Sequence, residues 1–192
     1  MKKVLLSAAV LFAALAGNAQ AFQKGSSTIN LGYGLLNVNR TTFKIYEAFD
    51  PTAKATAMGP AVIGYEYGVS DKISVGAQVG YGQVKLTMVD GSDKTVLQLN
   101  QITAVVRGAY HFGNGENFDP YVALGLGYNN FKYTAKENDK DVSADFTYAV
   151  PGAIGYTAAV GANYYFSKNI GAYAELGYTA GSLFQIGVKA KF

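Results

Sequence analysis

The sequence contains no cysteine and no tryptophan, and it has only one histidine. Without cysteine the chain forms no disulfide, no thiolate metal site and no cysteine nucleophile, and one histidine leaves a transition-metal site short of ligands. After the N-terminal segment, no apolar run reaches the roughly 20 residues that a membrane-spanning helix needs. The 16 basic and 13 acidic residues nearly balance, so nucleic acid is not an expected partner. These absences exclude a helical membrane protein and give no reason to expect a cofactor or a bound metal.

Residues 1–21 have the pattern of a cleavable export signal. Lys2 and Lys3 form a positive start, Val4–Ala16 is an apolar run, and Ala19-Gln20-Ala21 is a small-x-small cleavage site. We expect cleavage before Phe22, which leaves residues 22–192 as a single domain.

Glycine and aromatic residues are abundant, with 23 Gly, 15 Tyr and 11 Phe. After the signal segment, apolar residues alternate with glycine and polar residues in runs that turn residues separate, which is typical of an all-β chain. The eight strands that this alternation predicts are, approximately, Ser27–Leu36, Met58–Val69, Ile73–Gly82, Gln101–Phe112, Tyr121–Asn129, Gly155–Phe166, Ile170–Tyr178 and Phe184–Phe192.

The connections between these strands alternate in length. Long segments at Asn37–Ala57, Met88–Thr95 and Thr134–Thr147 alternate with short ones at Ser70–Lys72, Gly113–Asp119 and Ser167–Asn169, and the short connection at Thr179–Ser182 is an exception. Outer-membrane barrels have long extracellular loops and short periplasmic turns. The pattern therefore predicts that both termini lie in the periplasm.

The two faces of the predicted strands decide between a membrane barrel and a soluble one. A soluble barrel turns its apolar face inward, and its wet outer face carries many Lys, Glu and Thr; here the second face is largely glycine. Aromatic residues also gather at both ends of the apolar face, as at the two surfaces of a bilayer. They are Tyr33, Tyr81, Tyr128, Tyr156, Tyr178 and Phe184 at one end, and Tyr67, Tyr110, Phe112, Tyr164, Phe166 and Phe192 at the other.

The fold class that follows is all-β, an eight-stranded antiparallel up-and-down transmembrane β-barrel. The apolar face meets lipid and the glycine-lined face is enclosed, with room for inward Tyr165 and Tyr173. Because an open sheet edge in hydrocarbon leaves backbone groups unpaired, the first and last strands must pair.

Four segments carry a resemblance to a known family: Val106–Phe112, Tyr121–Tyr128, Tyr164-Tyr165-Phe166 and the end of the chain at Val188–Phe192. With the export signal, they resemble the small outer-membrane barrels of the OmpA, OmpX and OmpW type. The resemblance implies the outer membrane of a Gram-negative bacterium and contact with membrane lipids and lipopolysaccharide. It also implies that Phe192 is part of the signal read by the barrel-assembly machinery. Members of this family serve as structural anchors, adhesins, stress-related proteins or narrow conduits.

Charged residues on the enclosed face are the first candidate site. They are expected to form a network of ion pairs and hydrogen bonds, since a buried charge must be paired or hydrated. Arg107 is placed to meet Glu66 across the intervening strand, and Glu175 to reach Lys189 diagonally. The candidate interior network is Glu66, Arg107, His111, Glu175, Lys189 and Lys191.

Two functions fit such an interior. In the first, the interior is plugged and the protein is a structural or surface-interaction (adhesion-type) protein that acts through its extracellular loops. The alternative is a narrow conduit or a small hydrophobic-ligand carrier of the OmpW type. An eight-stranded barrel has an interior that side chains just fill, which favours the plug. His111 is expected at the periplasmic end pointing inward, so we predict no catalytic residues and no enzyme activity.

The loops hold the remaining candidates. Lys136–Asp141, with Asp145 beyond it, and Asp90–Asp93 are acidic but lack the spacing of an EF-hand, so we interpret them as solvated loops. The first long loop combines charges with four aromatic or apolar residues, which either contact an extracellular partner or pack on the barrel rim. These four are Phe43, Ile45, Tyr46 and Phe49.

Overall fold

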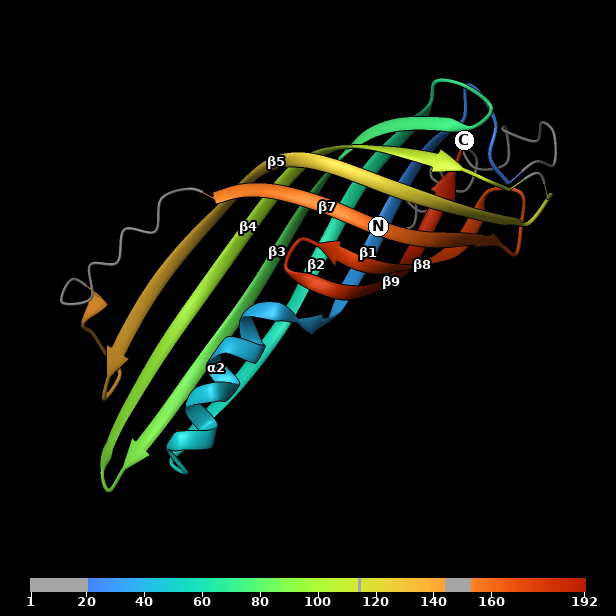
Figure 1. Ribbon diagram of the computed structural model, residues 1–192. Coiled ribbons are helices and arrows are strands. Elements are labelled where there is room, and N and C mark those ends of the chain that lie inside the picture. The colour runs from blue at the N-terminus through green and yellow to red at the C-terminus, as the bar shows by residue number, and fades with distance from the viewer. Residues whose placement is uncertain (1–20, 114, 144–152) are drawn as a thin grey trace, which may run out of the picture.

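The computed structural model describes residues 21–113, 115–143 and 153–192 and shows a closed antiparallel β-barrel with one helix (Figure 1). Eight long strands form the barrel, and β6 is a two-residue addition at its edge. The strands are β1 (Ser27–Asn37), β2 (Ala53–Gly68), β3 (Ile73–Asp90), β4 (Asp93–His111), β5 (Phe118–Glu137), β6 (Lys140–Asp141), β7 (Ala153–Tyr165), β8 (Ile170–Thr179) and β9 (Ser182–Lys191). The predicted fold class is confirmed, whereas residues 1–20 of the predicted export signal lie outside the described residues.

The barrel closes through the pairing of its first and last strands. β1 pairs with β9 from Thr28 opposite Lys191 to Asn37 opposite Ser182, and each remaining barrel strand pairs with its neighbour along the chain. Closure confirms the predicted pairing and leaves no open edge in the part of the barrel where all eight strands lie side by side.

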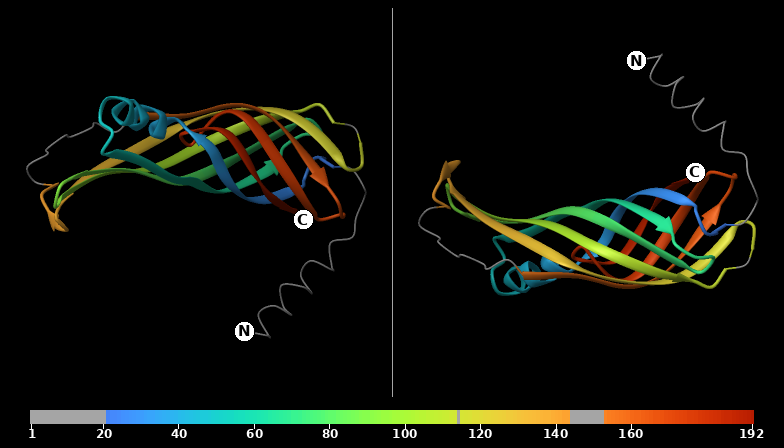
Figure 2. Two further views of the ribbon diagram at one scale, coloured as in Figure 1. Left: turned by 90° about the horizontal axis from the view of Figure 1, so that it is seen from below. Right: turned by 90° about the horizontal axis from the view of Figure 1, so that it is seen from above.

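The wall of the barrel is much higher on one side than on the other. β2 to β5 have 16 to 20 residues, whereas β1, β8 and β9 have 10 or 11. The tight turn at Ala180-Gly181, where both residues have positive φ (50° and 90°), keeps β8 and β9 short. Beyond Asn129, β5 leaves β7 and runs on with β2, β3 and β4 (Figures 1 and 2).

Three predicted loops are wrong in part because regular structure extends into them. β3 and β4 continue as a hairpin as far as Asp90 opposite Asp93, so the predicted loop Met88–Thr95 shrinks to a turn at Gly91-Ser92. β5 continues through Thr134 to Glu137 and pairs there with β6. The predicted loop Asn37–Ala57 contains a helix and the first part of β2, and residues 144–147 of the third predicted loop lie outside the described residues.

The helix α2 (Val38–Phe49) begins and ends at recognisable capping residues. The side chain of Asn37 accepts a hydrogen bond from Arg40 N, which satisfies one of the free amides of the first turn. Asp50 ends the helix, and Pro51 follows it, a residue that disfavours helical backbone immediately before it. None of the described helices is long and apolar enough to cross a membrane.

Two regions follow from this asymmetry. We call the closed eight-stranded part the barrel. We call α2 and the parts of β2 to β5 that rise above the low wall the lobe, which comprises Val38–Phe49, Ala53–Met58, Gln83–Asp90, Asp93–Asn100 and Asn130–Glu137.

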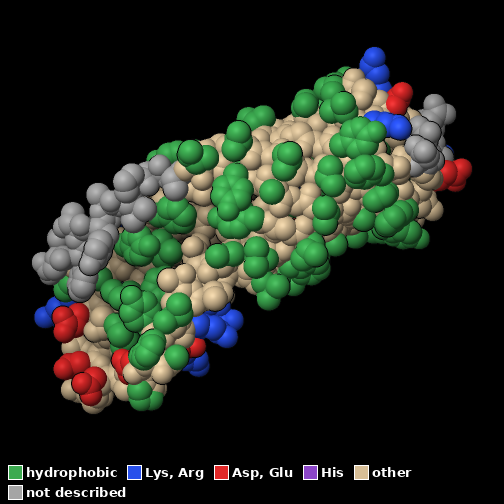
Figure 3. Space-filling view, viewed as in Figure 1, with side chains coloured by type: hydrophobic (Ala, Val, Ile, Leu, Met, Phe, Trp, Pro, Cys, Tyr) green, Lys and Arg blue, Asp and Glu red, His purple; other side chains and the backbone are tan. Residues whose placement is uncertain are grey.

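The side-chain pattern of the sheet inverts where the barrel becomes the lobe. On the barrel part of β3, Val79 and Tyr81 face outward and are exposed, while Gln78 faces inward and is buried; on the lobe part, Leu86 is buried and Lys85 faces outward. β4 does the same between exposed Ile102 and buried Leu99. On the face that Figure 3 shows, hydrophobic side chains accordingly cover the barrel, and the charged side chains gather towards its two ends.

In β2 the inversion is made by the backbone. Gly59 and Pro60 form a bulge between Met58, opposite Gln83, and Ala61, opposite Tyr81, which changes the face on which odd-numbered residues lie. Ile63 is therefore exposed outside the barrel, whereas Ala55 is buried inside the lobe. The lobe has the apolar interior of a water-soluble sheet, and the barrel has the apolar exterior of a membrane protein.

Candidate functional sites

Arg107 on β4 lies at the centre of an ion-pair network that crosses the inside of the barrel. Its Nε is 3.2 Å from Oε1 of Glu66 on β2, and its Nη2 is 2.6 Å from Oε1 of Glu175 on β8. Lys189 on β9 donates from Nζ to Oε2 of Glu66 at 3.0 Å. The side chains of these four residues are at most 7% exposed. Two cations and two carboxylates from four strands thus neutralise one another inside the barrel.

Neutral side chains complete the network. Tyr121 donates its hydroxyl proton to Oε1 of Glu175 at 2.8 Å, and Arg107 donates from Nη1 to Oε1 of Gln78 at 3.2 Å. Lys189 Nζ lies 5.5 Å from the centre of the Tyr121 ring, a cation–π distance. The expected contact of Glu175 with Lys189 is wrong: Glu175 lies opposite Gln185 on β9, and Lys189 lies opposite Gly171 on β8, four residues away. Glu175 pairs instead with Arg107, and Lys189 pairs with Glu66.

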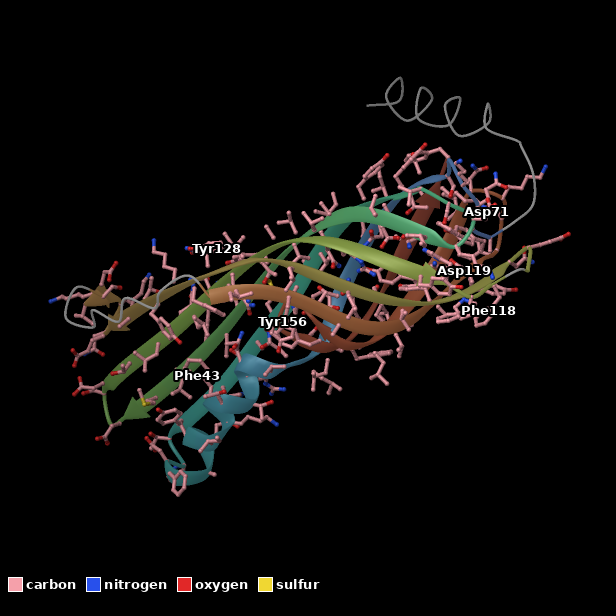
Figure 4. The ribbon with its side chains drawn as sticks, turned by 45° about the horizontal axis from the view of Figure 1, so that its top comes forward. Phe43, Asp71, Phe118, Asp119, Tyr128 and Tyr156 are labelled. Atoms are coloured by element: carbon pink, nitrogen blue, oxygen red, sulfur yellow. The ribbon has the colours of Figure 1, made fainter. Side chains whose placement is uncertain are left out.

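His111 lies in a second cluster, nearer the end where the first and last strands begin and finish. Its Nδ1 is 2.8 Å from Oδ2 of Asp119, and its Nε2 is 3.0 Å from the hydroxyl of Ser74. Asn163 donates from Nδ2 to Oδ2 of Asp119 at 2.8 Å. The ring of Phe22 stacks on His111 with 3.6 Å between ring centres. Figure 4 labels Asp119 at this end and Phe43 at the opposite, lobe end.

The order Ser74, His111, Asp119 is the order of hydrogen bonds in serine hydrolases. Here, however, Ser74 is 1% exposed and His111 2%, and Phe22 covers the ring. A substrate carbonyl has no approach to the Ser74 hydroxyl in this arrangement, so the cluster acts as packing. Sequence reasoning missed Asp119 because it placed this residue in a turn, although the alternation of Asp119, Tyr121 and Ala123 puts all three on the inner face.

Lys191 and Phe192 lie at the same end. Lys191 is half-buried, with Nζ 3.3 Å from the carbonyl of Ala21 and 4.7 Å from the centre of the Tyr165 ring, so it stands apart from the four-residue network. The backbone of Phe192 exchanges two hydrogen bonds with that of Ser27. Its role as an assembly signal stays a prediction.

Towards the lobe, the interior carries amides and hydroxyls. Tyr173 points inward, as predicted, and its hydroxyl accepts hydrogen bonds from Gln185 Nε2 at 2.6 Å and from Asn30 Nδ2 at 3.3 Å. A Cβ on Gly32 would collide with this hydroxyl, so the glycine makes room for the tyrosine. Asn39, in the first turn of α2, donates to Gln101 Oε1 at 2.6 Å and so ties the helix to the top of the barrel.

The lobe contains an apolar cavity of about 580 Å³ between α2 and the inner face of β3, β4 and β5. Phe43 packs on the buried cluster of Ala53, Ala55 and Leu86 and forms one wall. The other three residues named from the first long loop are exposed, with Phe49 at 85%, although Tyr46 also lines the cavity. The lining is Thr42, Phe43, Tyr46, Leu86, Met88, Leu97, Tyr133, Thr134, Ala135 and Ser143.

Two acidic residues beside the lobe accept hydrogen bonds from neighbouring hydroxyl groups. The hydroxyl and backbone N–H of Thr52 donate to Asp50 at 2.7 and 2.8 Å and lower the pKa of its carboxyl. Ser143 does the same to the pKa of Asp141. Among the residues that the structure describes, no three His, Cys, Asp or Glu side chains gather as metal ligands, and Asp145 lies outside them.

A closed eight-stranded barrel with an apolar exterior and a charged, paired interior defines an integral outer-membrane protein. The sequence matches the model of the family described as outer membrane protein beta-barrel domain over residues 5–192, so the chain belongs to this family. Comparison with curated proteins gave no match.

Solved structures of outer-membrane barrels are similar to this chain. OprG from Pseudomonas aeruginosa is 16% identical with a TM-score of 0.51, covering 91% of this chain and 99% of OprG. Ail, the attachment invasion locus protein of Yersinia pestis, is 13% identical with a TM-score of 0.50, covering 88% and 99%. The N-terminal barrel domain of OprF from Pseudomonas aeruginosa is 20% identical with a TM-score of 0.47, covering 88% and 99%. At these identities the likeness shows the fold alone.

Proposed function

We propose that this protein is a plugged, non-conducting outer-membrane barrel that holds its lobe at the cell surface, where the lobe makes structural or adhesion-type contacts. One observation carries the proposal: Arg107 joins Glu66 of β2 to Glu175 of β8 across the interior. An ion passing through would have to separate charges that are paired and removed from water, which costs far more than it regains in so narrow a barrel.

Single-channel recording in planar lipid bilayers tests the plug. The purified wild-type protein should give no stable conductance steps, while a large porin added to the same bilayer provides the positive control. Reproducible steps from the wild type would favour the narrow conduit instead. Steps that arise only in Arg107→Ala would support the plug, because they would show that this side chain closes the path.

The placement of the lobe outside the cell, with both termini in the periplasm, is part of the proposal. The absence of native cysteine makes a labelling test clean. Ser92→Cys lies in the turn between β3 and β4, and Lys168→Cys lies in the turn between β7 and β8 at the opposite end. On intact cells, a membrane-impermeant maleimide should label the first variant and not the second. The reverse pattern would invert the orientation.

The outer face of α2 supports the contact role. Ile45 is 56% exposed and Phe49 85%, on a helix that has no fully buried residue. Apolar side chains gathered on a surface mark interaction sites. Cells that display the Ile45→Ser, Phe49→Ser double variant should attach less to an apolar polystyrene surface than cells with equal amounts of the wild type. Equal attachment would remove α2 from the proposed contact surface.

A further inference from the structure

We propose that the lobe cavity is a binding site for a single-chain amphiphile, whose alkyl chain fills the cavity and whose polar end lies at its mouth. This inference rests on the proposed function, because it assigns a ligand class to the lobe. It needs no passage through the barrel, since the charged interior below remains closed.

The cavity is a built feature of the lobe, because its helical wall is tied at both ends. At the start of α2, Val38 N donates to the carbonyl of Gly181 at 2.9 Å, and Asn39 donates to Gln101. Towards its end, the carboxylate of Glu47 accepts from the N–H of Ala55 on β2. Between these ties, Phe43 contacts the sheet and leaves open space beside it. The helix therefore stands off from the sheet.

The apolar lining of the cavity favours an apolar ligand over an ion. Leu86, Met88 and Leu97 form the sheet side, and none of the described residues that line the cavity is charged. An ion would lose its water there without gaining a partner. The volume of about 580 Å³ lies inside the range of roughly 300–1,000 Å³ typical of small-molecule sites. Methionine adapts its flexible thioether to occupants of different shape.

The lining also contains polar groups that can bind the polar end of the ligand. Thr42, Thr134 and Ser143 are the hydroxyl-bearing aliphatic side chains of the lining, and the rings of Tyr46 and Tyr133 combine an apolar body with a polar tip. An alkyl chain with a small hydroxylated head matches this division into an apolar floor and a few polar groups. A protein segment fits less well, because α2 and the sheet bound the space on opposite sides.

Methionine methyl groups provide a matched pair of probes. The sequence contains Met1, Met58 and Met88. Met88 lines the cavity, whereas Met58 is 45% exposed beside the bulge of β2 and does not line it. The chain is labelled with 13C at the methionine methyls, placed in phosphatidylcholine nanodiscs and titrated with 1-decanol. Binding should move the Met88 signal to a plateau while the Met58 signal follows only the partition of decanol into the bilayer.

Substitutions on adjacent residues of β4 separate occupancy from general perturbation. Leu97→Phe fills the cavity and should weaken decanol binding at least tenfold, whereas Val96→Phe, which changes the opposite face of the same strand, should leave it unchanged. If Leu97→Phe fails to fold, Ala135→Leu narrows the cavity from β5 and serves in its place.

Three results would overturn the site. They are parallel responses of Met58 and Met88, an unmoved Met88 signal, and a Met88 signal that depends on protein concentration without decanol, which would mean that a second copy fills the cavity. Each of them leaves the plugged barrel and its orientation untouched. Conversely, conductance by the wild type would refute the plug without affecting the Met88 titration.

Discussion

The barrel and the lobe share the strands β2 to β5, three of which continue without a bulge, but the two regions solve opposite packing problems. In the barrel, lipid surrounds the sheet, so Val79 and Ile102 face outward and charge is enclosed; in the lobe, Leu86 and Leu99 face inward and Lys85 faces out. The interior of the barrel is filled by polar groups that bind one another, whereas the interior of the lobe is apolar and contains a cavity. The comparison shows that one strand can run from a lipid environment into a water-exposed region without ending.

The largest expected effect comes from the centre of the barrel. Among the described residues, Arg107→Ala leaves Glu66 with only Lys189 as an ion-pair partner and leaves Glu175 with none, so unfolding should become easier by about 3–5 kcal/mol. Urea unfolding in lipid vesicles, followed by the heat-dependent shift in gel mobility, measures this. Lys132→Ala, on the exposed face of β5, is the control and should change little. A variant as stable as the wild type would mean that the charges are not essential to packing.

A smaller effect is expected where a glycine admits an inward ring. Gly32→Ala sets a Cβ against the Tyr173 hydroxyl, and the resulting shift should destabilise the barrel by about 1–3 kcal/mol. The same unfolding assay applies. Gly108→Ala on β4 is the comparison, because the nearest atom to its added Cβ is Ser74 O at 3.6 Å, an ordinary contact. Equal stability of the two variants would contradict tight packing inside the barrel.

In the lobe, Phe43→Ala should act locally. The half-buried ring holds α2 on the sheet, and its loss should weaken that docking by about 1–2 kcal/mol. Hydrogen exchange should speed up at the amides of α2 while those of the barrel strands stay protected. Phe49→Ala, at an 85% exposed position, is the control. Loss of protection throughout the barrel would show that the two regions unfold together.

The smallest effect is a titration at the end of α2. The pKa of the Asp50 carboxyl should lie below its ordinary value, because the Thr52 hydroxyl stabilises the carboxylate, and Thr52→Val should raise this pKa towards the ordinary value. Since the folded pKa is depressed, this contact contributes stability above the unfolded pKa and is lost as the pH falls through the folded one. Carboxyl 13C chemical shifts measure both values. An unchanged pKa of Asp50 in the variant would mean that the backbone N–H of Thr52, and not its hydroxyl, lowers this pKa.

The barrel was predictable from sequence because period-two alternation specifies both a strand and its faces. It placed Tyr165, Tyr173 and the charges of the network on the inner face. The pairing of β1 with β9 followed from the cost of an open sheet edge in hydrocarbon. Individual ion pairs were harder, since they depend on the stagger between neighbouring strands; the register sets Glu175 opposite Gln185 and not near Lys189.

The lobe escaped sequence reasoning for a physical reason. Polar residues such as Lys85 and Gln98 interrupt the apolar face that marks lipid contact, so the strands seemed to end where only their surroundings changed. Alternation continues there with its phase reversed, and the pairs Lys85–Leu86 and Gln98–Leu99 were a readable signal. In β2, the bulge at Gly59-Pro60 hides even that signal, because it shifts the phase by backbone geometry.

The uninterrupted passage of β3, β4 and β5 through the boundary also has a mechanical consequence. A domain joined to its anchor by a linker samples many orientations, but this lobe is fixed to the barrel by three hydrogen-bonded strands. Its tilt and height above the bilayer are therefore set by the barrel itself. A molecule that contacts the lobe therefore meets it in one fixed orientation relative to the membrane.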